Sequence, residues 1–395
     1  MTSFDAILAK HTAAGGQKTN DKVLGASFVV VNKNGILYSG SAGRIDHTPD
    51  SSTWSTESFT WVASLTKIIT STSFMQLVEQ GLIGLDDDLR PLVPQLGQMQ
   101  ILKGFDSDEK PILEDHDTPI TSRMLLTHTV GLGYDLADED LMKWHKATGR
   151  KTTNLNGTLE GFTTPLKFKP GEGWCYGTAT DWLGHALEKI TGKSLGQYMT
   201  ENIFEPLGMK DTGFWPAKLP HVAERKAVWA YRGEDGSSLT SGPMPVAEER
   251  EMESGGAGLW TTAQDYGKFL TALMANRLVK KETLDEICRP QLNERQAAML
   301  NGIAFTWGAV VVEFSSEIPV SHGLGGCINM RDVPGKRKKG SIMWSGMANS
   351  RWWMDRESGV AAVMVTQVLP PGDPVSVKLY DELERAVYKE FVQQA

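Results

Sequence analysis

The sequence predicts an α/β fold in which the two ends of the chain build one domain and the middle forms a mostly helical insert. An Asn-Gly pair at 34–35 joins two β-rich runs near the N-terminus. A long helical pattern of apolar side chains follows at 64–81, and β character becomes frequent again only after Gly255. We therefore expect a discontinuous α/β domain from residues 1–85 and 253–395, around an insert of residues 86–252.

The first two elements are a hairpin and a long helix. The runs 26–32 and 36–39 are rich in β-forming residues, and Asn-Gly between such runs is a strong signal for a β-hairpin. From Ser64 onward, apolar residues recur three and four positions apart, which predicts a helix with one buried apolar face. Gly81 suits the C-terminal end of this helix.

The same periodicities predict further elements along the chain. In chain order they are helices at 181–190 and 194–203, strands at 305–314 and 340–344, a hairpin of 351–354 with 360–368, and a closing helix at 373–394.

The composition excludes several classes of partner. The chain has 395 residues, 40% of them hydrophobic and 22% charged, which is typical of a folded globular protein. Its net charge of −8 disfavours nucleic-acid binding, because phosphate recognition needs a basic surface. The basic run 336–339 follows Pro334 and Gly335, so we interpret it as a solvated loop. No apolar run approaches the roughly 20 residues of a membrane-spanning helix, so no membrane partner is expected.

The cysteines and the N-terminus predict a cytoplasmic protein. Cys175, Cys288 and Cys327 form an odd, sparse set rather than a disulfide framework, which fits a reducing compartment. Residues 1–10 lack the basic start and apolar stretch of a secretory signal.

Ser64 and Lys67 are the first candidates for chemistry. They are three residues apart at the start of the predicted helix, so their side chains share one face. A serine hydroxyl becomes an effective nucleophile when a neighbouring group takes its proton, and a buried lysine can assist. The alternative is a helix N-cap with a surface lysine. The same spacing at Ser107 and Lys110 lies in an acidic stretch typical of a surface loop.

Two further motifs indicate catalysis only when they are considered together with Ser64 and Lys67. Tyr176 is followed by Gly177 and Thr178, and a tyrosine near an ammonium group can act as a general base. The segment 344–346, Trp-Ser-Gly, ends a predicted strand, whose edge can supply a backbone N–H to an oxyanion. Taken alone, the first is more simply a packed loop aromatic and the second a strand that ends in a turn.

Other patterns have simpler structural explanations. The Gly-x-Ser-x-Gly pattern at 192–196 follows a helix instead of a strand, so we interpret Gly192 as a helix end and Ser194 as an N-cap. His128 is interpreted as a structural hydrogen-bonding residue, and the eight histidines show no metal-binding spacing. The glycines of 255–258 indicate a tight backbone passage. The tryptophans near the motifs, Trp174 and Trp344 among them, form either an apolar pocket or part of the core.

Taken together, the three motifs at Ser64-x-x-Lys67, Tyr176-Gly-Thr178 and Trp344-Ser-Gly346 resemble those of class C β-lactamases and the serine esterases and acyltransferases related to them. Segments 120–132, 205–212 and 255–262 are also similar to this family, and its fungal lovastatin-type acyltransferases are the nearest likeness. The resemblance covers roughly residues 20–390. It implies a β-lactamase/transpeptidase-like fold, with an antiparallel sheet flanked by helices.

The resemblance also implies a role for each motif. Ser64 is expected to be the nucleophile, Tyr176 the general base and Lys67 its electrostatic partner. The oxyanion hole is expected from the backbone amides of Ser64 and Met347, with Gly346 as the alternative to Met347. The residues expected to line the substrate pocket are Trp344, Ser345, Gly346, Thr178 and Trp174.

Two departures from the β-lactamase pattern bear on the substrate. Thr178 stands where β-lactamases have Asn, and Trp344 stands where they have Lys. Both changes remove groups that hold the carboxylate of a β-lactam or peptide. They argue against antibiotic hydrolysis and in favour of uncharged esters.

We therefore expect a serine acyl-transfer enzyme that cleaves short-chain acyl esters of a hydrophobic, polyketide-type secondary metabolite. Hydrolysis and transesterification remain open, with an alcohol acceptor or an acyl-thioester donor as partners in the second case. No metal or organic cofactor is expected, because the three motifs supply nucleophile, base and oxyanion donors. The alternatives are a β-lactamase or D-alanyl peptidase and, least favoured, a non-enzymatic penicillin-binding-like receptor.

Overall fold

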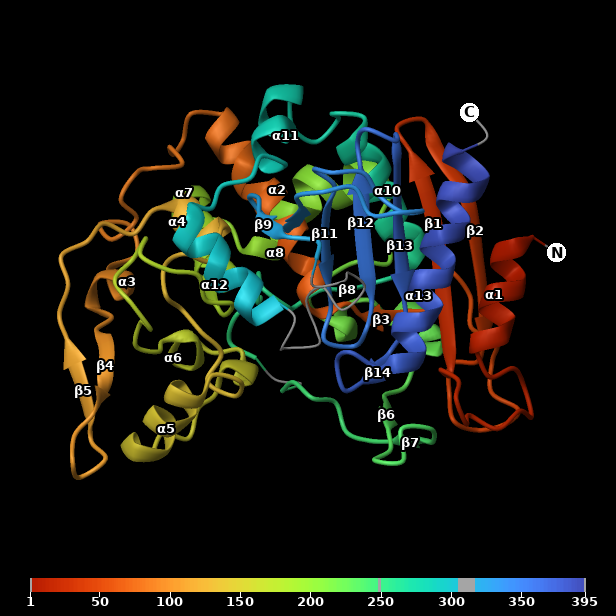
Figure 1. Cartoon of the computed structure of the whole chain (residues 1–395), viewed down its shortest axis with the longest axis horizontal. Helices are drawn as coiled ribbons and strands as arrows, with labels where there is room; N and C mark the ends of the chain where they lie inside the picture. Colours follow the sequence, from red (N-terminus) through yellow and green to blue (C-terminus); the bar gives the residue numbers. More distant parts are fainter. Residues whose placement is uncertain (1, 248–249, 305–316, 394–395) are drawn as a thin grey trace.

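Among the residues that the structure describes, an antiparallel sheet of seven strands forms the centre of the protein (Figure 1). The computed structural model describes residues 2–247, 250–304 and 317–393. The strand order places both ends of the chain side by side, because β1 pairs with β13 in a register that matches Val29 to Val363. From one edge to the other, the strands are β2 Gly35–Gly43, β1 Gly25–Asn32, β13 Val360–Val365, β12 Arg351–Asp355, β11 Ile342–Ser345, β10 Cys327–Asn329 and β9 Val320–His322.

The predicted N-terminal hairpin is confirmed as β1 and β2. The Asn32 side-chain oxygen accepts hydrogen bonds from the backbone N–H groups of Asn34 and Gly35, at 2.8 and 3.1 Å. Gly35 has a φ of +147°, a conformation that a residue with a Cβ atom rarely adopts. The side chain of Asn32 thus caps the two-residue turn of Lys33 and Asn34, and Gly35 begins β2 with a backbone conformation that glycine favours.

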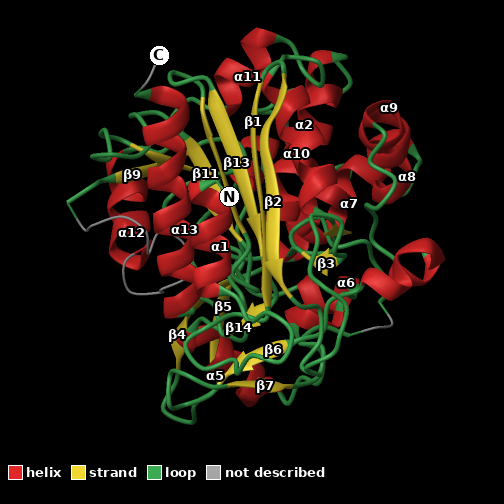
Figure 2. Ribbon diagram, turned by 90° about the vertical axis from the view of Figure 1, so that its right-hand side faces the viewer, coloured by secondary structure: helices red, strands yellow, loops and turns green. Residues whose placement is uncertain are grey.

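Helices cover both faces of the sheet. Figure 2 shows α1 (Ser3–His11) and α13 (Pro374–Val387) on one side, and α2 (Thr66–Glu79) and α10 (Ala263–Met274) on the other. The closing helix was predicted at 373–394; Asp373 is its N-cap, and a π-helical segment η6, Tyr388–Val392, extends it. Two further helices of this half are α11 Lys281–Ile287 and α12 Glu294–Ala304.

The predicted helix at 64–81 differs from α2 in two respects. A 3-10 turn, η1 (Ala63–Leu65), precedes it, so Ser64 lies in this turn and the α-helix begins at Thr66. The helix is buried around nearly its whole circumference instead of on one face. Its buried hydroxyls remain satisfied, since Thr72 and Ser73 donate to the carbonyls of Ile68 and Ile69 one turn earlier.

The middle of the chain contains more β structure than expected. Besides helices it holds the hairpin of β4 (Ile101–Phe105) with β5 (Pro111–Glu114), and that of β6 (Ala230–Arg232) with β7 (Leu239–Ser241). Its helical elements are α3 Pro94–Gln98, α4 Ser122–Leu126, α5 Glu139–Thr148, η2 Asn154–Asn156, α6 Leu159–Phe162, α7 Ala179–Thr191, α8 Leu195–Met199, the π-helix η3 Thr200–Phe204, α9 Glu205–Leu207, η4 Pro216–Lys218 and η5 Pro220–Arg225.

Two small sheets connect distant parts of the chain. β3 (Thr60–Trp61) pairs with β8 (Trp260–Thr261), and β14 (Val368–Leu369) pairs in parallel with β6. The run predicted as a single strand at 360–368 is therefore divided. The chain leaves the large sheet after Val365, and the side chain of Gln367 bonds to the backbone of Trp61 and Ala227.

The predicted strand at 305–314 lies outside the described residues. The helices predicted at 181–190 and 194–203 are confirmed as α7 and as α8 with its π-helical continuation. None of the described helices is both long and apolar enough to cross a lipid bilayer.

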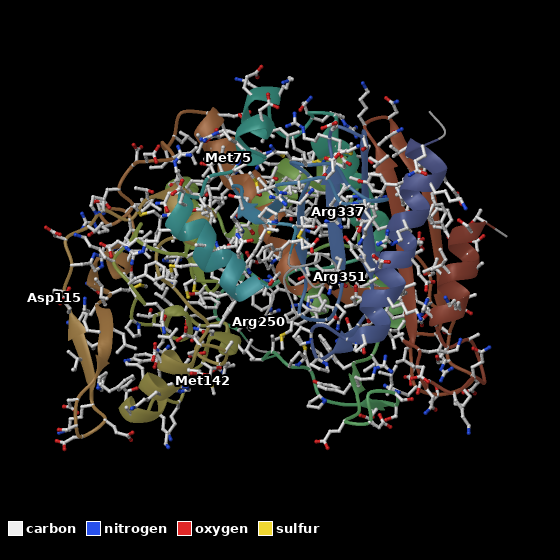
Figure 3. The ribbon with its side chains drawn as sticks, viewed as in Figure 1. Met75, Asp115, Met142, Arg250, Arg337 and Arg351 are labelled. Carbon is white, nitrogen blue, oxygen red and sulfur yellow. The ribbon has the colours of Figure 1, made fainter. Side chains whose placement is uncertain are left out.

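The interpretation of 336–339 as a solvated loop was wrong for its first two residues. Lys336 and Arg337 are buried, at 3% and 0% exposure. The Lys336 ammonium lies 3.0 Å from a carboxylate oxygen of Glu384, and the Arg337 guanidinium lies 2.7 Å from the other. Helix α13 supplies this carboxylate from far along the sequence, and Figure 3 shows this helix beside the labelled Arg337. A local Pro/Gly context cannot reveal such a partner.

Candidate active site

Ser64 lies in the turn that enters α2, directly after a residue with an unusual backbone. Ala63 has a φ of +46°, in the left-handed region, which costs an L-residue other than glycine roughly 1–2 kcal/mol. Such strain persists where the surrounding structure enforces it, and it is frequent at functional sites. Here it belongs to the turn that presents the Ser64 hydroxyl at the wall of a cavity, although the residue as a whole is only 9% exposed.

Lys67 is buried beneath Ser64, and its ammonium group has three acceptors. The Nζ atom donates to Ser64 Oγ at 3.2 Å, to the Tyr134 hydroxyl at 3.3 Å and to the Gly256 carbonyl at 2.8 Å. An ammonium group has three N–H donors, so each can be used. The three contacts fix the Lys67 side chain beside the serine.

Tyr176 completes the contacts around the serine hydroxyl. Its own hydroxyl donates to Ser64 Oγ at 2.7 Å and accepts a hydrogen bond from Trp344 Nε1 at 3.1 Å. The Lys67 ammonium lies 4.8 Å from the centre of the Tyr176 ring. The Tyr176 hydroxyl is therefore hydrogen-bonded to the first residue of each of the other two motifs, Ser64 and Trp344.

Asp181 and Lys67 both contact the backbone of one residue, Gly256. It lies in the first turn of α7 and accepts hydrogen bonds from the Ser254 hydroxyl and from the Gly256 N–H, the latter at 3.0 Å. The carbonyl of the same Gly256 accepts from Lys67. Burial raises the pKa of Asp181, and the positive charge of Lys67 and these hydrogen bonds oppose the rise. The sequence prediction of a tight glycine passage at 255–258 is explained by this contact.

The third motif covers the end of β11 and the start of the loop that follows, and this loop packs against the backbone before Ser64. A Cβ atom at Gly346 would lie 2.6 Å from the Val62 carbonyl oxygen, so only glycine fits there. The Gly346 N–H donates to the Ser350 carbonyl at 2.7 Å and is therefore engaged within its own loop. Of the two amides considered for the second oxyanion donor, this geometry favours Met347.

Further aromatic rings pack around Tyr176. His128 lies 5.1 Å from the Tyr176 ring and Trp174 lies 6.4 Å from it, nearly parallel. His322 packs against both His128 and Trp344, and its Nδ1 bonds to the Gly323 carbonyl. Burial lowers the pKa of His128 well below its usual value and that of His322 to about 4. Both imidazoles are therefore neutral at physiological pH and serve as packing groups.

Ser64 opens onto a cavity of about 640 Å³ whose wall is largely apolar. Tyr176, Trp344, Ser345, Gly346 and Met347 line it, together with Trp61, Ala63, Tyr134, Leu136, Ala137, Asn154, Leu155, Gly157, Phe162, Asp181, Val246, Arg250, Ser254, Ala257 and Pro371.

Trp174 and Thr178 were expected in the pocket, but they are not among the described residues that line it. Trp174 is buried and packs parallel to the ring of Tyr176, which itself lines the cavity. Thr178 is fully buried at the N-cap of α7, where its hydroxyl faces the Phe162 carbonyl at 3.4 Å.

Sequence reasoning missed two side chains of this site, Tyr134 and Asp181. A tyrosine in a loop has no local signal, because only the fold brings Tyr134 to Lys67. Asp181 carries a weak signal, since it is an acidic residue in the first turn of a helix that follows the second motif. Two alternatives are settled as expected: Ser194 caps α8, and Ser107 lies in the exposed turn between β4 and β5.

No cluster of three His, Cys, Asp or Glu side chains that could hold a metal ion occurs within the described ranges. The expectation that no metal or cofactor is needed stays a prediction.

Comparison with known proteins places this geometry in a family. The family model described as Beta-lactamase matches residues 4–386. The chain belongs to the Beta-lactamase family. Its β-lactamase/transpeptidase-like fold, with an antiparallel sheet and flanking helices, is thereby confirmed, as is the resemblance drawn from the three motifs.

Individual proteins are similar to most of the chain or to nearly all of it. The acyltransferase calJ of Penicillium decumbens is 33% identical over 99% of this chain and 99% of its own length. The lovastatin esterase of Penicillium rubens is 33% identical over 84% of this chain and 85% of its own. A LovD6 mutant of the simvastatin synthase from Aspergillus terreus superposes with a TM-score of 0.87 at 30% identity, covering 94% of this chain and 92% of the other. The chain is a serine esterase or acyltransferase that acts on small molecules.

Proposed function

We propose that this enzyme transfers a short acyl group through an ester formed on Ser64. The observation that carries the proposal is the contact set of the Ser64 hydroxyl, which lies 2.7 Å from the Tyr176 hydroxyl and 3.2 Å from the Lys67 ammonium. These are the distances at which a base can take a proton from a nucleophile.

In the proposed acylation, Tyr176 as phenolate takes the proton of Ser64 while Oγ attacks the carbonyl carbon of the ester. The ammonium of Lys67 stabilises the phenolate before the transfer and remains protonated throughout. The carbonyl oxygen becomes an oxyanion that accepts hydrogen bonds from the backbone amides of Ser64 and Met347. When the tetrahedral intermediate collapses, Tyr176 passes the proton to the departing alcohol or thiol.

In the proposed deacylation, the same groups act on the second substrate, which is water or an alcohol. Tyr176 takes the proton of water or of an acceptor alcohol, whose oxygen attacks the acyl-Ser64 carbonyl. The Ser64 oxygen then leaves and regains the proton from Tyr176. Water gives a free acid and an alcohol gives a new ester, so hydrolysis and transfer use the same residues.

The cavity supports a hydrophobic, drug-sized substrate. Its volume of about 640 Å³ lies within the range of small-molecule sites. Aliphatic and aromatic side chains such as Leu136, Leu155, Phe162 and Val246 form much of its wall. The relatives include a protein named for lovastatin, and we propose a short-chain ester of a polyketide-type secondary metabolite as substrate for this chain as well.

An incubation with an acyl donor and graded alcohols decides between hydrolysis and transfer. The donors are a p-nitrophenyl butyrate and a butyryl thioester, and the acceptors are hydrophobic secondary alcohols. For a transferase, ester product rises with alcohol concentration while free acid falls. Free acid alone, at every alcohol concentration and with every acceptor, would leave only the esterase. The Ser64→Ala variant is the control, because it must abolish both products.

We further propose that the enzyme works in the cytoplasm, since its three cysteines are buried free thiols. Fractionation of the source cells, with activity followed by the same ester assay, tests this location.

A further inference from the structure

Asp181 is the one acidic residue among the described residues that line the cavity opened by Ser64. Only 3% of Asp181 is exposed to solvent. A buried carboxylate costs free energy unless a positive charge or hydrogen-bond donors compensate it. The other charged residue in the described wall is Arg250, whose Nη2 donates to the Phe214 carbonyl. The mechanism proposed above gives Asp181 no role.

Asp181 holds a short backbone segment, residues 254–257, from the side of helix α7. Its Oδ1 atom accepts hydrogen bonds from the Ser254 hydroxyl and from the Gly256 N–H, the second at 3.0 Å. The packing is close, because a Cβ atom at position 256 would lie 2.5 Å from Asp181 Oδ2. The carboxylate therefore fixes where the backbone of Gly256 lies.

The carbonyl of Gly256 is the closest of the three described acceptors of the Lys67 ammonium. It lies 2.8 Å from Nζ, whereas Ser64 Oγ lies at 3.2 Å and the Tyr134 hydroxyl at 3.3 Å. One residue thus connects two charged groups, because the N–H of Gly256 binds Asp181 and its carbonyl binds Lys67. A movement of Gly256 would change the position of the ammonium relative to the serine.

Two further hydrogen bonds hold the segment 254–257 from other elements. The Thr70 hydroxyl of α2 donates to the Gly255 carbonyl at 2.7 Å, and the Trp61 indole N–H of β3 donates to the Ala257 carbonyl at 2.6 Å. These contacts remain in a variant of Asp181. An amide at position 181 can accept the same hydrogen bonds as the carboxylate, so a substitution can remove the charge and keep the contacts.

The negative charge of Asp181 matters most after the proton of Ser64 has moved. The three described acceptors of Lys67 are neutral groups. In the proposed mechanism, Tyr176 is a phenolate before it takes this proton and is neutral afterwards. The buried ammonium of Lys67 then lacks the phenolate as a counter-charge, and an unpaired buried charge is costly.

The other titratable groups around Lys67 carry no negative charge. Burial lowers the pKa of His128 well below its usual value and that of His322 to about 4, and the charge of Lys67 acts in the same direction. Burial raises the pKa of Tyr134 well above its usual value, so all three groups are neutral at neutral pH. Burial also raises the pKa of Asp181, but the charge of Lys67 and the two hydrogen bonds oppose this rise and favour the carboxylate.

We propose that Asp181 is a positioning residue for Lys67. It holds the Gly256 carbonyl against the ammonium, and its charge keeps the ammonium protonated while Tyr176 carries the proton of the serine. Asp181 acts through Lys67 and exchanges no proton with the substrate. This inference rests on the proposed function, because it explains how Lys67 stays charged through the acylation step.

The variant Asp181→Asn tests the role of the charge with p-nitrophenyl butyrate as substrate. It should lower kcat about tenfold to a hundredfold, as for loss of an interaction with a charged group, and leave KM nearly unchanged. The alkaline limb of the pH profile of kcat should move to lower pH by roughly one unit, because a missing negative neighbour favours loss of the Lys67 proton. A purely structural role would not move this limb.

Chemical rescue provides a second test that does not depend on the Asn variant. Asp181→Ala leaves space in the cavity wall for a small carboxylate from solution. Formate should restore part of its kcat, whereas formamide, which has a similar size and no charge, should not.

Glu188→Gln is the matched control, because it makes the same acid-to-amide change on the same helix. The Glu188 carboxylate accepts a hydrogen bond from the Leu195 N–H at 3.0 Å and is not among the described residues of the cavity wall. This variant should keep the wild-type kcat and pH profile. Circular dichroism and thermal unfolding show whether each variant is folded, and rescue of Asp181→Ala decides if Asp181→Asn is not.

Three results would overturn the proposal. They are a wild-type kcat in Asp181→Asn, a loss that appears in KM alone, and a loss that is equal at every pH while formate fails to rescue Asp181→Ala. Failure of the proposed function is a separate result, because it would appear as turnover that survives Ser64→Ala.

Discussion

The indole N–H of Trp344 donates a hydrogen bond to the Tyr176 hydroxyl across 3.1 Å. The two residues are 168 positions apart and belong to different motifs. Trp344, the first residue of the third motif, is thus hydrogen-bonded to Tyr176, the first residue of the second motif. A neutral donor at this place can stabilise negative charge on the phenol oxygen without adding a cation beside the substrate.

Replacing Trp344 with Phe should lower kcat about tenfold to a hundredfold, because the phenolate of Tyr176 loses a donor while the ring packing is largely kept. The measurement is steady-state kinetics on a p-nitrophenyl ester. Trp352→Phe is a matched control, since Trp352 is also fully buried and lies opposite Trp344 in the sheet, outside the cavity wall. Equal kinetics for the two variants would remove Trp344 from the mechanism.

Tyr176→Phe and Lys67→Ala should each be nearly as damaging as the loss of Ser64, by about three orders of magnitude in kcat. The three residues form one hydrogen-bonded unit, and the effects of removing members of such a unit do not add. Single-turnover kinetics on an aryl ester measure the acylation step directly. A double variant that is much slower than either single variant would show that the residues act independently.

Gly346→Ala should impair acylation about a hundredfold while the protein remains folded. The added Cβ would meet the Val62 carbonyl at 2.6 Å, so the loop carrying Met347 must shift relative to Ser64. A displacement of about 1 Å in a catalytic group can have an effect of this size. Gly97→Ala is the control, because its nearest neighbour would be a flexible arginine side chain at 3.4 Å. Circular dichroism and thermal unfolding separate loss of fold from loss of rate, and an active Gly346→Ala enzyme would contradict the placement of the oxyanion hole.

The stability of the protein should fall as the pH is lowered from about 6.5 towards 4.5. Burial lowers the pKa of His322 from 6.5 in the unfolded chain to about 4, so the unfolded state binds more protons in this interval. His322 alone accounts for roughly 2–3 kcal/mol of this loss at pH 4.5, and His128 changes stability in the same direction.

Urea unfolding at pH 4.5, 5.5 and 6.5 measures this dependence. The variant His322→Asn, whose amide can keep the hydrogen bond to the Gly323 carbonyl, should show a flatter dependence by up to about 1.4 kcal/mol per pH unit. Parallel curves for variant and wild type would show that His322 is already protonated in the folded protein.

The sequence predicted elements whose signals are local and missed features that depend on tertiary contacts. The hairpin turn and the cap at Ser194 were predictable because residues close together in the sequence form them. Asn32 accepts a hydrogen bond from the N–H of Asn34, and Ser194 accepts one from the N–H of Gln197. Lys336 and Arg337 were misjudged because Glu384 reaches them from a helix some 50 positions later in the chain. Tyr134 joined the site only through folding.

The division into residues 1–85 with 253–395 and an insert of 86–252 stays a prediction. The pairing of β6 with β14 shows that the chain around residue 230 also contacts the C-terminal half. Limited proteolysis that releases a stable fragment of about residues 86–252 would support the division.

The central claim is that the acyl group is carried by Ser64. Its most direct test is to mix the enzyme with p-nitrophenyl butyrate, quench within the first turnover and map the peptides by mass spectrometry. If Ser64 carries the acyl group, the peptide that contains Ser64 should gain the mass of one butyryl group, and the Ser64→Ala protein should gain none. A butyryl group on Ser194 or another residue, with Ser64 unmodified, would rule out Ser64 as the nucleophile.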